Sequence, residues 1–133
     1  MVGRLLAVLA TQLRDQARVL ELGTGAGVGT AWIVSGLLPR TGATVLTVEN
    51  DARTAAVAAR GDWPSFVELR RGDALEVLAR SGGGFVDDMT PLPDWTDSHR
   101  AAQERVRQTL LTAPGLTSVE LAHGSGVILS ARG

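Results

Sequence analysis

The sequence contains no cysteine, no lysine and no tyrosine, and all 13 of its basic residues are arginine. Without cysteine there are no disulfides, thiolate nucleophiles or sulfur-ligated metal sites. Without lysine and tyrosine, neither residue type is available as a general base, and Schiff-base chemistry is excluded. The catalytic chemistry open to this chain is therefore narrow from the start.

Long hydrophobic runs are also absent. No segment approaches the roughly 20 apolar residues that a membrane helix needs. The opening segment "MVGRLLAVLA" continues into Gln12, Arg14 and Asp15 without a cleavage-like site, so it fits an amphipathic helix better than a signal peptide. We therefore expect a cytoplasmic protein.

Charge of either sign is not in excess. The chain has 133 residues, 44% of them hydrophobic, and a formal net charge of -1, which suits one domain with its own core. Near-neutral charge gives no bulk attraction to phosphate polymers or anionic membranes, and the nearest basic patch is only the pair Arg70 and Arg71. We expect a single domain over residues 1–133, with no nucleic-acid partner and no membrane partner.

Strands and helices alternate through the first 81 residues. Short β-branched runs predict strands, and apolar residues at helical spacing predict helices between them. This alternation is typical of a parallel sheet covered by helices. We therefore expect an α/β fold, a Rossmann-like open and mostly parallel sheet with helices on both faces. The expected strands are 18–22, 42–49 and one through Arg70; the expected helices are 2–14, 30–39 with a stop at Gly36 or Pro39, one from an Asp51 cap to a Gly61 stop, and 74–81.

The alternation breaks after residue 81. A very short strand at Phe85 to Asp87 precedes a proline-rich loop, and the last 17 residues predict two strands joined at "HGSG", a C-terminal antiparallel hairpin. Between them the spacing predicts a helix through Leu111. Its candidate caps are Thr96, Asp97 and Ser98, and its expected inner stripe is Ala102, Val106 and Leu110.

The stretch "VLELGTGAGVG" places four glycines at alternate positions after the first strand. A glycine loop between a strand and a helix sets backbone amides and the positive end of the helix dipole beside a ligand. The register, Gly23, Gly25, Gly27 and Gly29, matches the dinucleotide pattern G-x-G-x-x-G poorly. An NAD(P)-binding oxidoreductase domain remains an alternative at this point.

With Glu21 included, the stretch is E-x-G-x-G-x-G, and here the chain resembles the class I S-adenosylmethionine-dependent methyltransferases, in particular small O-methyltransferases. The resemblance implies that the glycine loop lies against the methionine and ribose parts of the cofactor. It also implies that Glu49 binds both ribose hydroxyls, and that Asp73 in "GDA" meets the adenine. The cofactor-binding residues expected on this basis are Glu21, Gly23, Thr24, Gly25, Gly27, Glu49, Asn50, Asp73 and Ala74.

Elementary chemistry agrees with these roles but leaves a structural alternative. A carboxylate suits a vicinal diol because two hydroxyls can donate to its two oxygens, and ligands of open α/β sheets settle at the carboxyl ends of the strands. Glu49 and Asp73 both fall at such ends. An acid at a strand end can also simply cap the next helix.

The resemblance covers nearly the whole chain but skips one part. Between Ser81 and Gly82 the family has a fourth strand, its loop and a helix, for which there is no room here. The strand at Phe85 to Asp87 must therefore either pair directly with the first strand as the fifth, or take over the fourth position. Either arrangement is expected to leave apolar surface that the absent helix normally covers.

The missing part also affects the expected chemistry. Asp87-Asp88 stands where metal-dependent members carry an Asp-Asn pair, but the partner carboxylate from the fourth strand has no counterpart. A solvated strand end is therefore favoured over a magnesium site, and we assign no metal ligands. His99 and His123 are the only histidines, and Trp95 in the proline-rich loop is a candidate for lining an acceptor pocket.

The sequence thus predicts an S-adenosylmethionine-dependent methyltransferase that transfers a methyl group to an oxygen of a small hydroxylated acceptor. The mechanism is direct displacement, which demands placement more than catalytic side chains, so no catalytic residue is assigned. The main alternative is a catalytically impaired cofactor-binding module left by an internal deletion. Related enzymes often pair, so a homodimer is a further expectation.

Overall fold

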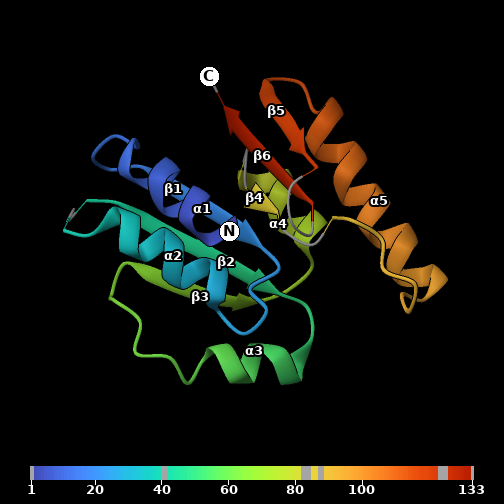
Figure 1. Ribbon diagram of the computed structural model, residues 1–133, viewed down its shortest axis with the longest axis horizontal. Coiled ribbons are helices and arrows are strands. Elements are labelled where there is room, and N and C mark those ends of the chain that lie inside the picture. The colour runs from blue at the N-terminus through green and yellow to red at the C-terminus, as the bar shows by residue number, and fades with distance from the viewer. Residues whose placement is uncertain (1, 40–41, 82–84, 87–88, 123–125, 133) are drawn as a thin grey trace.

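The computed structural model describes residues 2–39, 42–81, 85–86, 89–122 and 126–132. Its strands and helices follow the alternation expected from the sequence (Figure 1). The strands are β1 (Arg18–Leu22), β2 (Thr44–Glu49), β3 (Val67–Arg71), β4 (Phe85–Val86), β5 (Leu116–Leu121) and β6 (Val127–Arg132). The helices are α1 (Val2–Thr11), α2 (Val28–Leu37), α3 (Ala52–Ala58), α4 (Ala74–Ser81) and α5 (Asp97–Thr112).

The strands form one six-stranded sheet in the order β3-β2-β1-β4-β6-β5. Strands β1 to β4 are mutually parallel, whereas β6 runs antiparallel to both β4 and β5. The predicted open, mostly parallel sheet with a C-terminal antiparallel hairpin is therefore confirmed.

Each face of the sheet carries its own hydrophobic core, because successive side chains along a strand point to opposite faces. Leu20 and Leu22 of β1 pack with side chains from α4 and α5, whereas Val45 of β2 packs with side chains from α1 and α2. Figure 1 shows α1 and α2 together in front of the central strands, with α4 behind them. The helices thus cover both faces, as predicted.

The capping residues follow the sequence, and α2 ends just before Pro39, one of its two predicted stops. The Asp51 side chain accepts a hydrogen bond from the Thr54 N–H at 2.8 Å, and Thr96 caps α5 through the N–H of His99. Gly36 lies inside α2 rather than at its end. A Cβ at Gly36 would collide with the backbone oxygen of Ala7 in α1, so this glycine permits two helices to pack closely.

The missing segment leaves a single strand between β1 and β6. The backbone of Phe85 and Val86 pairs with Glu21 and Leu22 of β1 on one side and with β6 on the other. Strand β4 therefore pairs directly with β1 and is also the neighbour of the hairpin strand β6.

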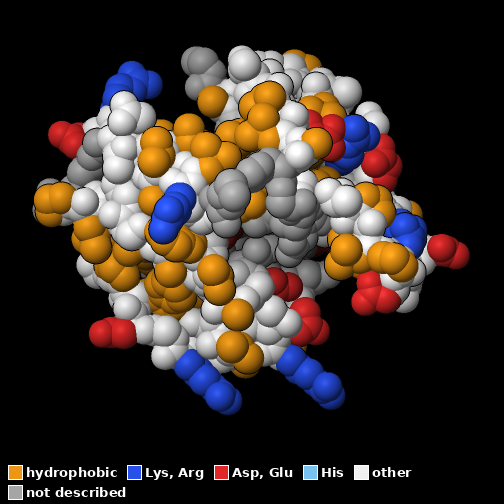
Figure 2. Space-filling view, viewed as in Figure 1, with side chains coloured by type: hydrophobic (Ala, Val, Ile, Leu, Met, Phe, Trp, Pro, Cys, Tyr) orange, Lys and Arg blue, Asp and Glu red, His pale blue; other side chains and the backbone are white. Residues whose placement is uncertain are grey.

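Among the described strand residues around this shortened region, Val119 of β5 is 49% exposed, whereas those that pack under α5 are covered. Leu22 and Ile128 are 2% and 0% exposed, and they pack with Val106 and Leu110 of α5. Exposed apolar side chains also lie on α1 and α2, including Val8 and Trp32, and Figure 2 shows hydrophobic side chains over this face. Among the described helices, none is long and apolar enough to cross a membrane.

Candidate functional site

The glycine loop after β1 is bonded along the end of β2. The Gly23 and Thr24 N–H groups both donate to the carbonyl oxygen of Val48, at 2.8 and 3.1 Å. The next N–H, that of Gly25, donates to Glu49 Oε2 at 2.9 Å. Hydrogen bonds to the carboxyl end of β2 therefore hold the main chain of the loop in place.

The glycines of the loop have two different functions. Among the described residues, no atom lies within 4 Å of a Cβ built on Gly23 or Gly25, so their main chain faces open space there. A Cβ on Gly27 would come within 2.6 Å of the Trp63 ring, and one on Gly29 would collide with the Glu21 carboxylate. Gly23 and Gly25 therefore leave space beside the main chain for a ligand, whereas Gly27 and Gly29 permit close packing within the protein.

Glu49 lies beside this open main chain. One carboxylate oxygen accepts the Gly25 N–H, and the other accepts the Asp51 N–H at 2.9 Å. Its own carbonyl oxygen accepts the Gly72 N–H at 3.0 Å, which joins the ends of β2 and β3. The predicted juxtaposition of the glycine loop and a strand-end carboxylate is thus present.

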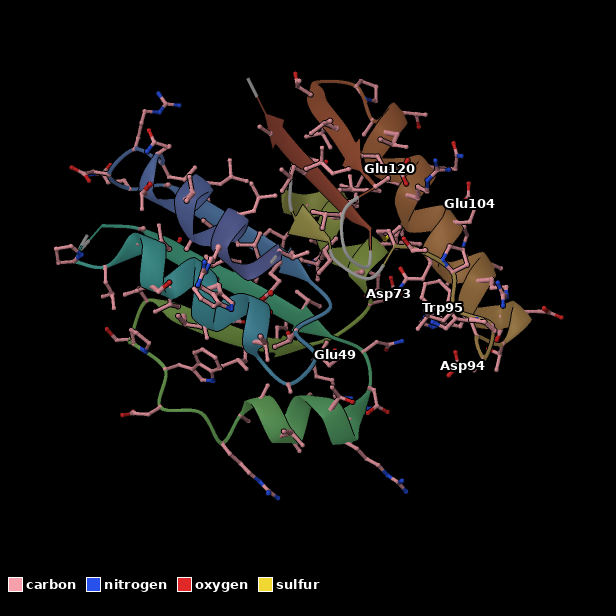
Figure 3. All side chains as sticks on the ribbon, viewed as in Figure 1. Glu49, Asp73, Asp94, Trp95, Glu104 and Glu120 are labelled. Carbon is pink, nitrogen blue, oxygen red and sulfur yellow. The ribbon has the colours of Figure 1, made fainter. Side chains whose placement is uncertain are left out.

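Asp73 lies at the same edge of the sheet and also caps a helix. Its Oδ1 accepts the N–H groups of Leu75 and Glu76 at 2.7 and 3.3 Å, at the start of α4. Figure 3 shows Asp73 and Glu49 at the same end of the parallel strands. The capping alternative therefore holds for Asp73, and it does not remove the exposed carboxylate from the edge where a ligand would lie.

The remaining predicted site residues differ in exposure. Asn50 is exposed after the end of β2, whereas Ala74 is half-buried and packs against the core beneath α4. Thr24 is buried, and its hydroxyl lies 2.6 Å from that of Thr47. The main chain of Thr24 is therefore the part available to a ligand.

Glu21 is placed differently from the other acids. Its side chain is 2% exposed, and its Oε2 accepts the hydroxyls of Thr30 and Thr47 at 2.5 and 2.7 Å. Sequence reasoning missed both threonines. The sequence did hold a signal for Thr47: it lies two residues before Glu49, so the two side chains point to the same face of the sheet.

The loop before α5 lies at this end of the molecule in Figure 3. The Trp95 ring is half-buried and meets His99 edge to face, with ring centroids 4.5 Å apart. Arg100 holds the loop by donating to the carbonyl oxygens of Leu92 and Trp95 at 2.7 and 3.3 Å. Trp95 and His99 therefore form one pair, next to loop carbonyl groups that Arg100 binds.

Three sequence candidates, Asp87, Asp88 and His123, lie outside the described residues. Within the part of the chain that the structure describes, no group of three or more histidine and acidic side chains could hold a metal ion.

No protein-family model matches the chain. The sequence is 42% identical over 117 residues to a protein of Mycobacterium sp. (strain JLS) named "Putative O-methyltransferase", a match that covers 86% of this chain and 51% of that protein. It is 40% identical over 80 residues to a catechol O-methyltransferase of Niastella koreensis, covering 57% of this chain and 35% of that enzyme. The chain spans about half the length of the first of these relatives. The relatives give no support to a dinucleotide oxidoreductase.

Solved structures share the fold over nearly the whole chain. Cofactor-bound Rv0187 from MTB aligns with a TM-score of 0.63 at 25% identity, covering 98% of this chain and 79% of that one. An O-methyltransferase from Bacillus cereus in complex with SAH aligns with a TM-score of 0.66 at 20% identity, covering 99% and 80%. The architecture is therefore the class I methyltransferase fold in a shortened form.

Proposed function

The chain is related in sequence to O-methyltransferases and has the class I methyltransferase fold, and on this premise we propose that it is an S-adenosylmethionine-dependent O-methyltransferase. The acceptor is a small hydroxylated molecule. The observation that carries this function is the open main chain of Gly23 and Gly25 with the Glu49 carboxylate hydrogen-bonded to it.

The residues at the sheet edge fit the cofactor. Side chains at Gly23 and Gly25 would fill the space where the ligand approaches the main chain. Each Glu49 oxygen accepts one main-chain N–H, and a carboxylate oxygen can accept a second donor. Glu49 therefore retains acceptor capacity for two ribose hydroxyls, and Asp73 lies further along the same edge for the adenine.

The contribution of the protein to the reaction is placement. S-adenosylmethionine, when bound, would supply a methyl group already activated by its positively charged sulfur. The glycine loop and Glu49 fix the nucleoside, so that an acceptor oxygen on the open side can align with the methyl group. We place the acceptor near Trp95, whose ring is held by its contact with His99 and by the loop contacts of Arg100.

Calorimetric titration with S-adenosylhomocysteine tests the site. We expect binding by the parent protein, and at least a tenfold weaker affinity for Gly25→Val and Glu49→Ala, which is about 1.4 kcal/mol. Glu68→Ala, which removes an exposed acid of β3, is the matched control and should bind as the parent does. Equal affinity in all four proteins would show that the site is wrong.

Methyl transfer is tested separately, because the shortened region favours one specific alternative. A single short strand separates β1 from the hairpin, so a binding module without turnover would also carry this loop. Incubation with labelled S-adenosylmethionine and catechol-type acceptors distinguishes the two. Labelled product supports the enzyme, whereas tight binding of S-adenosylhomocysteine without any product supports the binding module.

Assembly and location belong to the same proposal. We propose a homodimer in which the exposed apolar residues of α1 and α2, among them Val8, Leu9 and Trp32, are covered. Sedimentation analysis should give twice the monomer mass, and Val8→Glu should lower it. A cytoplasmic location is proposed with it, and fractionation of expressing cells tests it.

A further inference from the structure

A chain of buried hydrogen bonds runs beneath the glycine loop. It connects Glu21 of β1, Thr47 of β2 and Thr24 of the loop, which are 2%, 0% and 4% exposed. The Thr47 hydroxyl donates to Glu21 Oε2 at 2.7 Å and lies 2.6 Å from the hydroxyl of Thr24. None of these three side chains faces the open side of the loop.

The direction of this chain follows from the donors available. A carboxylate only accepts hydrogen bonds, and a threonine hydroxyl carries a single proton. Because Thr47 gives its proton to Glu21, the proton between the two hydroxyls must come from Thr24. The Thr24 hydroxyl is therefore directed inward, and the hydrogen bond to Glu21 sets the orientation of both hydroxyls.

Glu21 also holds the far end of the loop. The hydroxyl of Thr30, in the first turn of α2, donates to the same Oε2. The carboxylate lies so close to the main chain of Gly29 that a Cβ there would collide with it. One buried carboxylate thus joins the strand before the loop, the neighbouring strand and the helix after the loop.

We propose that Glu21 and Thr47 are positioning residues that hold the main chain of Thr24 and Gly25 in the ligand-binding conformation without touching the ligand. This inference rests on the proposed function for the identity of the ligand. It gives Glu21 an indirect role in binding, in place of the direct contact expected from the sequence. Thr47, which the sequence did not single out, becomes the link between the buried carboxyl group of Glu21 and the loop.

The test compares Thr47→Val, which removes both hydrogen bonds at nearly constant volume, with Thr47→Ser, which keeps the hydroxyl. Thr44→Val, at an exposed position of the same strand, is the control. Two properties are measured: the affinity for S-adenosylhomocysteine, and the amide hydrogen exchange of Thr24 and Gly25 without ligand. The second needs no ligand and therefore reports on the loop by itself.

We expect Thr47→Val to weaken S-adenosylhomocysteine binding by roughly five- to tenfold, the range of a buried hydrogen bond, and to speed amide exchange in the loop. Thr47→Ser should restore both, and Thr44→Val should change neither. Unchanged affinity or exchange in Thr47→Val, or a serine variant as impaired as the valine variant, would overturn the inference.

If Thr47→Val does not fold, Thr24→Val carries the test, because it leaves Glu21 bonded to Thr30 and Thr47. Thr24→Ser is its rescue, and the same two readouts apply. Where both valine variants fold, their effects on affinity should not add, since each breaks the hydrogen bond between Thr24 and Thr47. Full additivity would contradict the inference.

Failure of the parent protein to bind S-adenosylhomocysteine would instead overturn the proposed function. The comparison of amide exchange rates would still decide whether the buried hydrogen bonds hold the loop.

Discussion

Gly25 has a backbone φ of 56°, in the left-handed region that favours glycine. Its N–H donates a hydrogen bond to Glu49, and no atom of the described residues lies within 4 Å of the place where a Cβ would stand. The glycine is therefore not needed to avoid a clash with the residues that the structure describes. It is needed for the turn itself and for the ligand's approach to the main chain.

Gly25→Ala should consequently affect binding more than folding. We expect a loss of unfolding free energy of roughly 1–2 kcal/mol from the left-handed conformation, and a larger loss of S-adenosylhomocysteine affinity because the methyl group enters the ligand space. Thermal unfolding and calorimetry measure the two effects. Gly72→Ala, where φ is not positive and a Cβ would lie 3.9 Å from Val48, is the control. A stability loss with unchanged affinity would contradict the assigned position of the ligand.

At the scale of elements, α5 is attached to the hairpin by an ion pair as well as by its apolar face. Arg107 donates to both oxygens of Glu120 in β5, at 2.8 and 2.6 Å. Hydrogen bonding from this guanidinium lowers the pKa of Glu120 below its ordinary value of 4.5, and the same contact raises the pKa of Arg107. The pair joins two elements that follow the shortened region.

The stability provided by this pair should depend on pH. Because the folded-state pKa of Glu120 is lower than the unfolded value of 4.5, its contribution is present above 4.5 and is lost as the pH falls through the folded-state pKa. Glu120→Gln should therefore melt at a lower temperature than the parent at neutral pH, and this difference should shrink in acid and in high salt. Glu68→Gln, whose ion pair lies within β3, should have the smaller effect. A difference that is constant with pH would contradict this role.

The start of α5 offers a second prediction for this helix. Thr96 accepts the His99 N–H at 3.2 Å, which satisfies one of the unpaired donors of the first turn. Thr96→Ala should lower the unfolding free energy by about 1 kcal/mol, whereas Thr96→Ser should retain most of it. Thermal melts compare the two variants. Equal losses would indicate that the methyl group, not the hydroxyl, is the important part.

At the scale of the whole molecule, the proposed ligand contacts come from three strands at once. The loop follows β1, Glu49 ends β2 and Asp73 follows β3. These groups are brought together only in the folded chain, since their separation in sequence is large. Ligand binding should therefore be coupled to global stability.

S-adenosylhomocysteine at about 100 times its dissociation constant should add roughly 2.7 kcal/mol to the stability of the folded state. For a domain of this size we expect the melting temperature to rise by roughly 5–10 °C. NADH at the same concentration should give no such shift. A larger rise in melting temperature with NADH than with S-adenosylhomocysteine would contradict the cofactor assignment.

Local chemistry allowed much of this structure to be predicted. The alternating apolar runs defined the strands, and short-range capping fixed the starts of α3 and α5 at Asp51 and Thr96. Of the two stops predicted for α2, Pro39 was correct and Gly36 was not, because Gly36 serves the close packing against α1, which no local pattern contains. The glycine loop and Glu49 could likewise be predicted as components of the site, since each lies at the end of a strand.

The sequence by itself therefore determined the class of fold, the strand ends and the acids that occupy them, because these depend on periodicity and on neighbours a few residues apart. Only the tertiary structure decided that β4 fills the gap between β1 and β6, and that Glu21 turns inward to Thr47. Both outcomes depend on the register between strands that are distant in the chain. Such pairing is set by how the whole sheet packs against its helices, and no single segment carries that information.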